Sequence, residues 1–271
     1  MKSTKLFIFS AFMLLASCDG RKEKHENSEG DWVQKVVDTD HGPVREKQVT
    51  GDFDEIEVSQ AIEAEIIKSD LEKVVISAPE NIIDEILVDI SGGKLHIHYK
   101  KGIRVMNSHK VSAKIYAKDF SKINANSAAG ITVKDKFVQD KTEVEVSSSA
   151  SVNGNLEAND FEISVGSGSN FTGKIWAVDL DVDASSGASV DLSGKAKKAE
   201  VSSSSGSSVS AKDMVADQVK ADASSGASID ISASSSINAE ASSGGSVDVY
   251  KKGNVTSVTK QENSGGSVSI H

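Results

Sequence analysis

The chain has 271 residues, of which 38% are hydrophobic and 5% aromatic, and its formal net charge is −10 at pH 7. This acidic balance excludes nucleic acid as a partner, because the phosphate backbone needs neutralising Lys and Arg side chains. The single cysteine excludes an internal disulfide framework and a CxxC metal site. The scarcity of aromatic residues predicts a narrow core filled by small side chains.

The first 17 residues have the pattern of a signal peptide. Lys2 and Lys5 precede an apolar run over 6–15, which is shorter than the roughly 20 residues that a membrane span needs. Cys18 follows two small residues and resembles the cysteine of a bacterial lipobox. That resemblance implies cleavage before Cys18, lipidation of Cys18 and anchoring in a bacterial envelope membrane, with the protein on the cell surface or facing the periplasm. A simple secretory signal with an incidental cysteine is the alternative.

Two segments of different character precede the C-terminal half. Residues 18–44 are charged and poor in apolar side chains, and they predict a flexible tether. Residues 45–122 predict a less regular β region, in which Gly92-Gly93 indicates a hairpin and 78–86 a bend with one helical turn. The strand-like stretches of this region are 53–59, 62–68, 73–77, 86–90, 94–99 and 111–117.

A repeat of about 20 residues fills the C-terminal half, from 123 to 271. The seven residues at 183–189 (DASSGAS) recur identically at 222–228. In each copy an apolar residue, which we call the anchor, follows a cluster of small residues. The eight anchors are Ile131, Val152, Phe171, Val190, Val209, Ile229, Val247 and Val268.

Apolar and polar residues alternate on both sides of each anchor, which is typical of β-strands. A single copy is too small to bury its apolar face, so the copies must stack on one another. We therefore predict an all-β fold, a right-handed parallel β-helix of about eight coils over 123–271, preceded by the β region over 45–122. Lys260 and Glu262 replace apolar residues in the last copy, which predicts a charged cap at the open end of the sheet.

Every copy carries a serine four residues before its anchor, and glycine follows it in six copies. The Ser-Gly pair predicts a bend that needs positive φ. The even offset predicts that the serines point inward and form a structural ladder of hydroxyls along the rod. An exposed serine stripe that binds glycan or ice, or carries O-linked sugar, is the alternative. The serines are Ser127, Ser148, Ser167, Ser186, Ser205, Ser225, Ser243 and Ser264.

The order of short motifs along the chain resembles the family described as "putative auto-transporter adhesin, head GIN domain". FDEI at 53–56, APEN at 78–81 and GKLHI at 93–97 precede the Ser/Gly-rich repeats. The resemblance covers about residues 45–271. It implies a β-helical fold akin to pectin-lyase-like solenoids, a place among bacterial envelope lipoproteins, a role in adhesion and no established catalytic residues.

Few residues support a metal or ligand site. His96 and His98 share a strand face, but Lys94 and Lys100 flank them and a third ligand is not evident, so we predict a polar surface without metal. Asp179, Asp181 and Asp183 alternate along one strand and with Asp191 could offer oxygen ligands to calcium, but the repeat lacks the glycine-rich calcium-binding nonapeptide and a solvated acidic face is the favoured interpretation. Four aspartates form the candidate ligand face. These aspartates are Asp181, Asp191, Asp230 and Asp248.

The sequence favours a noncatalytic function without a cofactor. The repeats contain no arginine and no GxSxG motif, and they hold few aromatic candidates for a sugar platform, among them Phe161, Phe171, Trp176 and Tyr250. We predict a lipid-anchored envelope adhesin or surface scaffold, with a glycan or an extracellular matrix protein as partner. A β-helical lyase or hydrolase acting on polysaccharide is the first alternative, and a periplasmic structural or stress-related protein is the second.

Overall fold

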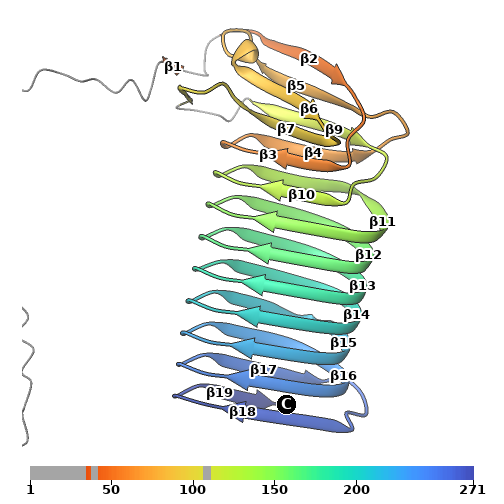
Figure 1. Cartoon of the computed structure of the whole chain (residues 1–271), viewed down its shortest axis with the longest axis vertical. Coiled ribbons are helices and arrows are strands. Elements are labelled where there is room, and N and C mark those ends of the chain that lie inside the picture. Colours follow the sequence, from red (N-terminus) through yellow and green to blue (C-terminus); the bar gives the residue numbers. More distant parts are fainter. Residues whose placement is uncertain (1–34, 38–41, 106–110) are drawn as a thin grey trace, which may run out of the picture. The chain divides into compact units, whose positions relative to one another are not determined.

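The computed structural model describes residues 35–37, 42–105 and 111–271. Nineteen strands and one 3₁₀ turn, η1 (Ile83–Glu85), make up this part of the chain, and it contains no α-helix. The predicted signal peptide over 1–17 and Cys18 lie outside the described residues. The fold class predicted from the sequence is confirmed: the protein is a β-solenoid of about eight turns (Figure 1).

The N-terminal β region contains the six predicted strands and two more, β2 and β8. β1 and β8 pair in parallel in a small sheet of their own. The strands that precede the repeats are β1 (Lys35–Val37), β2 (Val44–Thr50), β3 (Glu55–Val58), β4 (Glu63–Lys68), β5 (Lys73–Pro79), β6 (Ile86–Ser91), β7 (Lys94–Tyr99), β8 (Ile103–Val105), β9 (Ser112–Ala117) and β10 (Lys122–Ala125).

The repeats form a stack in which every strand pairs in parallel with the equivalent strand of the next coil. Residues one repeat apart therefore lie beside each other, as the sequence periodicity predicts. The strands of the stack are β11 (Gly130–Val146), β12 (Ser151–Val165), β13 (Asn170–Ala184), β14 (Ser189–Ser203), β15 (Ser208–Ala223), β16 (Ser228–Ala241), β17 (Ser246–Lys251), β18 (Ser257–Glu262) and β19 (Ser267–Ile270).

Each long strand bends once, which gives the coil two legs. In β12 the alternation of buried and exposed residues breaks at Asn159 and Asp160, both of which are exposed. We call the half before this bend the first leg and the half after it the second leg. The apolar side chains of both legs fill one core; in β13 these include Phe171 on the first leg and Val182 on the second, both fully buried.

Ser-Gly turns connect the second leg of one coil to the first leg of the next, and their tips line up along one edge of the stack (Figure 1). Ser186 and Gly187 both have positive φ, 52° and 70°. Ala188 N–H closes the turn onto the Ser185 carbonyl at 3.1 Å, and Gly187 N–H donates to the Ser205 carbonyl of the following coil at 3.1 Å. The predicted bend is confirmed.

The prediction that the serine hydroxyls point inward and form a ladder is wrong. All eight serines of the column are exposed and have φ between 47° and 55°. Left-handed backbone at the tip interrupts the strand alternation, so an even offset from the anchor no longer means the inward side. Neighbouring turns are joined instead by backbone N–H groups that donate hydrogen bonds to the carbonyls of these serines. The corrected residues are Ser127, Ser148, Ser167, Ser186, Ser205, Ser225, Ser243 and Ser264.

The buried serines are others, and two of them, Ser169 and Ser207, lie two residues before an anchor. Ser169 Oγ donates to the Val146 carbonyl at 2.8 Å, and Ser207 Oγ donates to the Ala184 carbonyl at 2.9 Å. These bonds link successive coils inside the core, and they satisfy polar groups whose burial would otherwise cost stability.

The two ends of the stack are closed differently. At the N-terminal end β3 and β4 join the parallel stack through β10 and β11, and the antiparallel strands β2, β5 and β6 complete this end of the sheet. At the C-terminal end every residue of β18 is exposed. Lys260 and Glu262 lie 2.9 Å apart there, and Glu262 Oε1 accepts the Val268 N–H at 2.7 Å. A charged last coil of this kind discourages further strands from pairing.

We expect Val190→Asp or Val209→Asp to destabilise the stack strongly. Both valines are fully buried in the thin core, and an unpaired carboxylate at either position should cost at least about 3 kcal/mol of unfolding free energy. Denaturant unfolding followed by circular dichroism measures the change. Ser210→Asp is the matched control, because it introduces the same side chain at an exposed neighbour of Val209. An unchanged unfolding midpoint in the valine variants would contradict the solenoid core.

Candidate binding surface at Trp176

Trp176 is an exposed aromatic side chain on the first leg of β13. It is 43% exposed, whereas its neighbours Ile175 and Ala177 are 1% exposed. Strand alternation sends these neighbours into the core and the indole outward. Coil register places Glu157 of β12 and Lys195 of β14 on either side of Trp176. A large apolar side chain held outside a fold with so few aromatic residues marks a candidate binding surface.

Two grooves meet at Trp176 and Glu157. We call the first the lysine groove; it has a volume of about 460 Å³, within the usual range for ligand sites. Its lining consists of Lys134, Asp135, Lys136, Asn155, Leu156, Glu157, Lys174, Ile175, Trp176, Gly194 and Lys195. The second, the bend groove, has a volume of about 410 Å³ and follows the bends of β11 and β12 toward Asp54 and Asp119.

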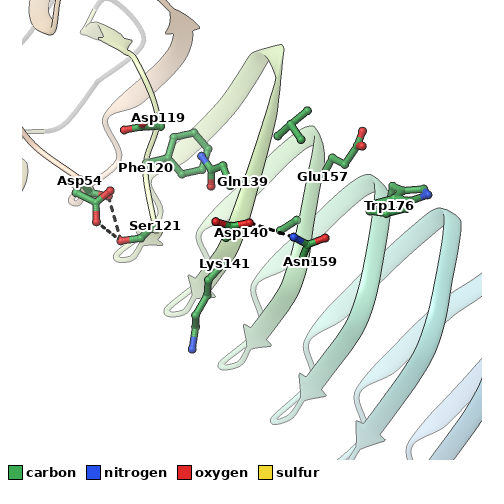
Figure 2. A pocket seen from close by; sticks show the side chains of 12 residues that line it. Asp54, Asp119, Phe120, Ser121, Gln139, Asp140, Lys141, Glu157, Asn159 and Trp176 are labelled. Carbon is green, nitrogen blue, oxygen red and sulfur yellow. Dashed lines mark hydrogen bonds between the residues drawn. The ribbon is translucent and has the colours of Figure 1, made fainter.

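Figure 2 shows the bend groove, with Glu157 and Trp176 projecting outward from neighbouring coils. Asn159 Nδ2 donates to Asp140 Oδ1 at 3.1 Å, and the Ser121 hydroxyl donates to the Asp54 carboxylate. These bonds hold the polar side chains of the groove to one another and to fixed strands. The apolar part of the shared surface is therefore the indole, which stays open to solvent.

The lysine groove is locally positive on an otherwise acidic protein. Four lysines and two carboxylates line it. Both carboxylates are engaged: Glu157 Oε2 lies 2.5 Å from Lys136 Nζ, and Asp135 Oδ2 accepts the Lys68 N–H at 2.8 Å. Lys174 and Lys195 are exposed and form no ion pair with any residue that the structure describes. Two unpaired ammonium groups thus flank Trp176.

The four predicted aspartates do not form one ligand face. Asp191, Asp230 and Asp248 lie in one column of the first leg, with Ser210 between the first two. Two of them have partners: Asp230 Oδ1 accepts the Tyr250 hydroxyl at 3.3 Å, and Asp248 Oδ1 lies 3.0 Å from His271 Nε2.

Asp181 lies on the second leg, among other carboxylates. Glu162 and Glu200 are its register neighbours in the adjacent coils, and Asp183 follows two residues later. Partial burial raises the pKa of Asp181, and the negative charges of Asp183, Glu200 and Glu162 raise it further. Within the described ranges, no group of three His, Cys, Asp or Glu side chains is arranged to hold a metal ion.

His96 and His98 form a stacked pair, with ring centroids 4.1 Å apart. His96 Nε2 lies 3.0 Å from Ser59 Oγ and 3.5 Å from Glu57 Oε1, and His98 Nε2 lies 3.0 Å from Asp89 Oδ2. Burial lowers the pKa of His96, and the nearby Glu57 carboxylate opposes that shift. The ring nitrogens face hydroxyl and carboxylate partners of this chain, which is the arrangement of a polar surface cluster.

Comparison with known proteins assigns the chain to a family. The family model described as "putative auto-transporter adhesin, head GIN domain" matches residues 52–253. The chain belongs to this family. No curated protein matches it. The match agrees with the resemblance seen in the sequence motifs. In the described part of the chain, no helix has the length and hydrophobicity of a membrane span.

Solved structures share the fold at low sequence identity. A putative adhesin from Parabacteroides distasonis has a TM-score of 0.80 and 18% identity, over 88% of this chain and 100% of its own. A putative adhesin from Parabacteroides merdae has a TM-score of 0.75 and 17% identity, over 84% and 98%. A third structure, named as a putative lipid binding protein from P. distasonis, has a TM-score of 0.69 and 19% identity, over 88% and 100%. At such identities these likenesses establish the fold alone.

Sequence reasoning identified Trp176 as an aromatic candidate but missed the two lysines beside it. Lys174 precedes Trp176 by two residues, and Lys195 follows it by 19, which is one repeat. Trp176 and Lys195 are each the fifth residue after an anchor. Comparing this position between repeats would have placed Lys195 beside Trp176.

We expect Asp181→Asn to stabilise the folded protein at pH 7. The folded state raises the pKa of Asp181 above its ordinary value of 3.8, so the ionised side chain disfavours folding at neutral pH. The gain should disappear as the pH falls below 3.8, because the wild-type carboxyl is then protonated in both states. Thermal unfolding from pH 3 to pH 8 measures the difference. Asp191→Asn is the control on the other leg, and a gain that does not depend on pH would contradict the electrostatic explanation.

Proposed function

We propose that this protein is a noncatalytic, lipid-anchored adhesin of the bacterial envelope. The observation that carries the proposal is Trp176, an indole held open to solvent between two unpaired lysines on a rigid sheet. Membership of an adhesin family supports the same function. A preformed surface on paired strands suits binding without rearrangement, because little side-chain or loop entropy is lost when the partner arrives.

Attachment to the membrane is proposed through Cys18. The basic start of the chain, the apolar run over 6–15 and the small residues before Cys18 support cleavage and lipidation there. Residues 18–44 then separate the acyl chains from the solenoid, and an outer-membrane location fits such an anchor. The proposed partner is a glycan or an extracellular matrix protein, which would meet the solenoid at the Trp176 surface.

We expect Cys18→Ala to release the protein from the membrane fraction. Wild-type cells should incorporate a labelled fatty acid into the protein and the variant should not, since the acylated thiol is absent. Adhesion of intact cells to glycan-coated and matrix-coated surfaces should fall when the gene is deleted and recover with the wild-type chain but not with Cys18→Ala. Protease added to intact cells distinguishes a surface location from a periplasmic one. Unchanged adhesion after deletion would refute the adhesin function, and membrane retention of the unlabelled variant would refute the anchor.

A further inference from the structure

The surroundings of Trp176 suit a sugar ring better than a purely apolar ligand. The indole offers a flat apolar surface, and the C–H face of a pyranose can stack on it. Asn155 and Ser193 lie in register with Lys174 on the two adjacent coils. Neither side chain has a hydrogen-bond partner among the residues in the described ranges, so both remain available to sugar hydroxyls. Stacking and hydrogen bonding are thus offered side by side.

The two unpaired lysines add a charge requirement. Lys174 lies two residues from Trp176 along β13, on the order of 7 Å away, and Lys195 lies one coil away, at about 5 Å between backbones. Both ammonium groups can therefore reach an anionic substituent on a ring that stacks on the indole. The protein carries a net charge of −10, so the attraction for an anionic ligand has to come from the lysines of the groove itself.

The position of the groove within the sheet disfavours a peptide. It crosses β11, β12, β13 and β14. On β13 and β14, where Trp176 and the two unpaired lysines lie, the groove residues are paired with a neighbouring strand on both sides, whereas residues 134–136 of β11 lie in an irregularity of the pairing. No free strand edge is therefore open beside Trp176 for an extended peptide to add to, which is a common way for sheets to bind peptides.

We propose that the lysine groove binds an acidic polysaccharide, with a uronate or sulfated sugar stacked on Trp176 and its anionic group between Lys174 and Lys195. This inference rests on the proposed function and names the chemistry of its partner. Lysine is a point charge without the fixed fork of arginine, so the site selects for charge near a ring and not for one orientation of the anionic group.

Titration calorimetry of the purified full chain tests the proposal with defined probes. Oligogalacturonate should bind, and its methyl-esterified form, which keeps the ring but loses the charge, should bind at least about tenfold more weakly. Sulfated and unsulfated forms of one further oligosaccharide distinguish sulfate from carboxylate as the preferred group. Raising the salt concentration should weaken binding of the charged probes, because part of the attraction is between exposed charges.

Two variants separate the parts of the site. Trp176→Ala and the double variant Lys174→Gln/Lys195→Gln should each lower affinity for oligogalacturonate at least about tenfold, and the double variant should also reduce the salt dependence. Lys251→Gln/Lys252→Gln is the matched control: it makes the same change in net charge at two exposed positions outside the groove and should leave binding unchanged. Unfolding curves confirm that all variants are folded.

Several results would overturn the inference. The first is that neither oligogalacturonate nor the sulfated probe binds, and the second is that the charged and esterified probes bind with equal affinity. The third is that the control variant loses as much affinity as the groove variants. The fourth is that poly-glutamate binds as tightly as oligogalacturonate, which would indicate an acidic peptide as the ligand. Cell adhesion keeps this failure distinct from failure of the proposed function. If gene deletion abolishes adhesion while Trp176→Ala preserves it, the adhesin function stands and the assigned groove is wrong.

Discussion

Backbone hydrogen bonding between equivalent residues of successive coils is the constraint on which this structure depends. From β10 to β17 each strand finds its donors and acceptors in the coil before and the coil after it, and the Ser-Gly turns continue the same pattern through serine carbonyls. Because the register is held from coil to coil, one apolar residue in a repeat defines a buried column through the whole stack. Small residues suffice, since the core is only as wide as two facing legs.

The same register sorts the surface into columns, and the columns differ in chemistry. On the second leg the carboxylates of Glu162, Asp181 and Glu200 lie beside one another, and burial adds to their repulsion at Asp181. On the first leg a single column holds Glu157, Trp176 and Lys195. The acidic total of the chain therefore conceals a local excess of positive charge, which composition alone cannot reveal. Position within the coil decides which charges meet.

The sequence predicted the architecture well because the determining signal is local and repeated. Eight anchors at nearly constant spacing fix the stack, and Gly92-Gly93 fixes the hairpin between β6 and β7. The prediction that the serine column points inward failed for a physical reason. Counting even and odd positions assumes a continuous strand, and two residues with left-handed backbone interrupt the strand at each turn. Trp176 could be noticed from its rarity, but its partnership with Lys195 depends on which residues face each other across coils. The four aspartates do not form one ligand face because the bend divides each repeat into two legs, and Asp181 lies on a different leg from the other three.

The closed ends of the stack have a consequence wherever many copies of the protein lie close together. Antiparallel strands cover one end, and the ion pair of Lys260 with Glu262 guards the other. A β-solenoid with bare ends would template the addition of another molecule and grow into fibres. Here neither terminus offers a matching partner, so neighbouring molecules can crowd together as separate particles, and each keeps its lateral surface free.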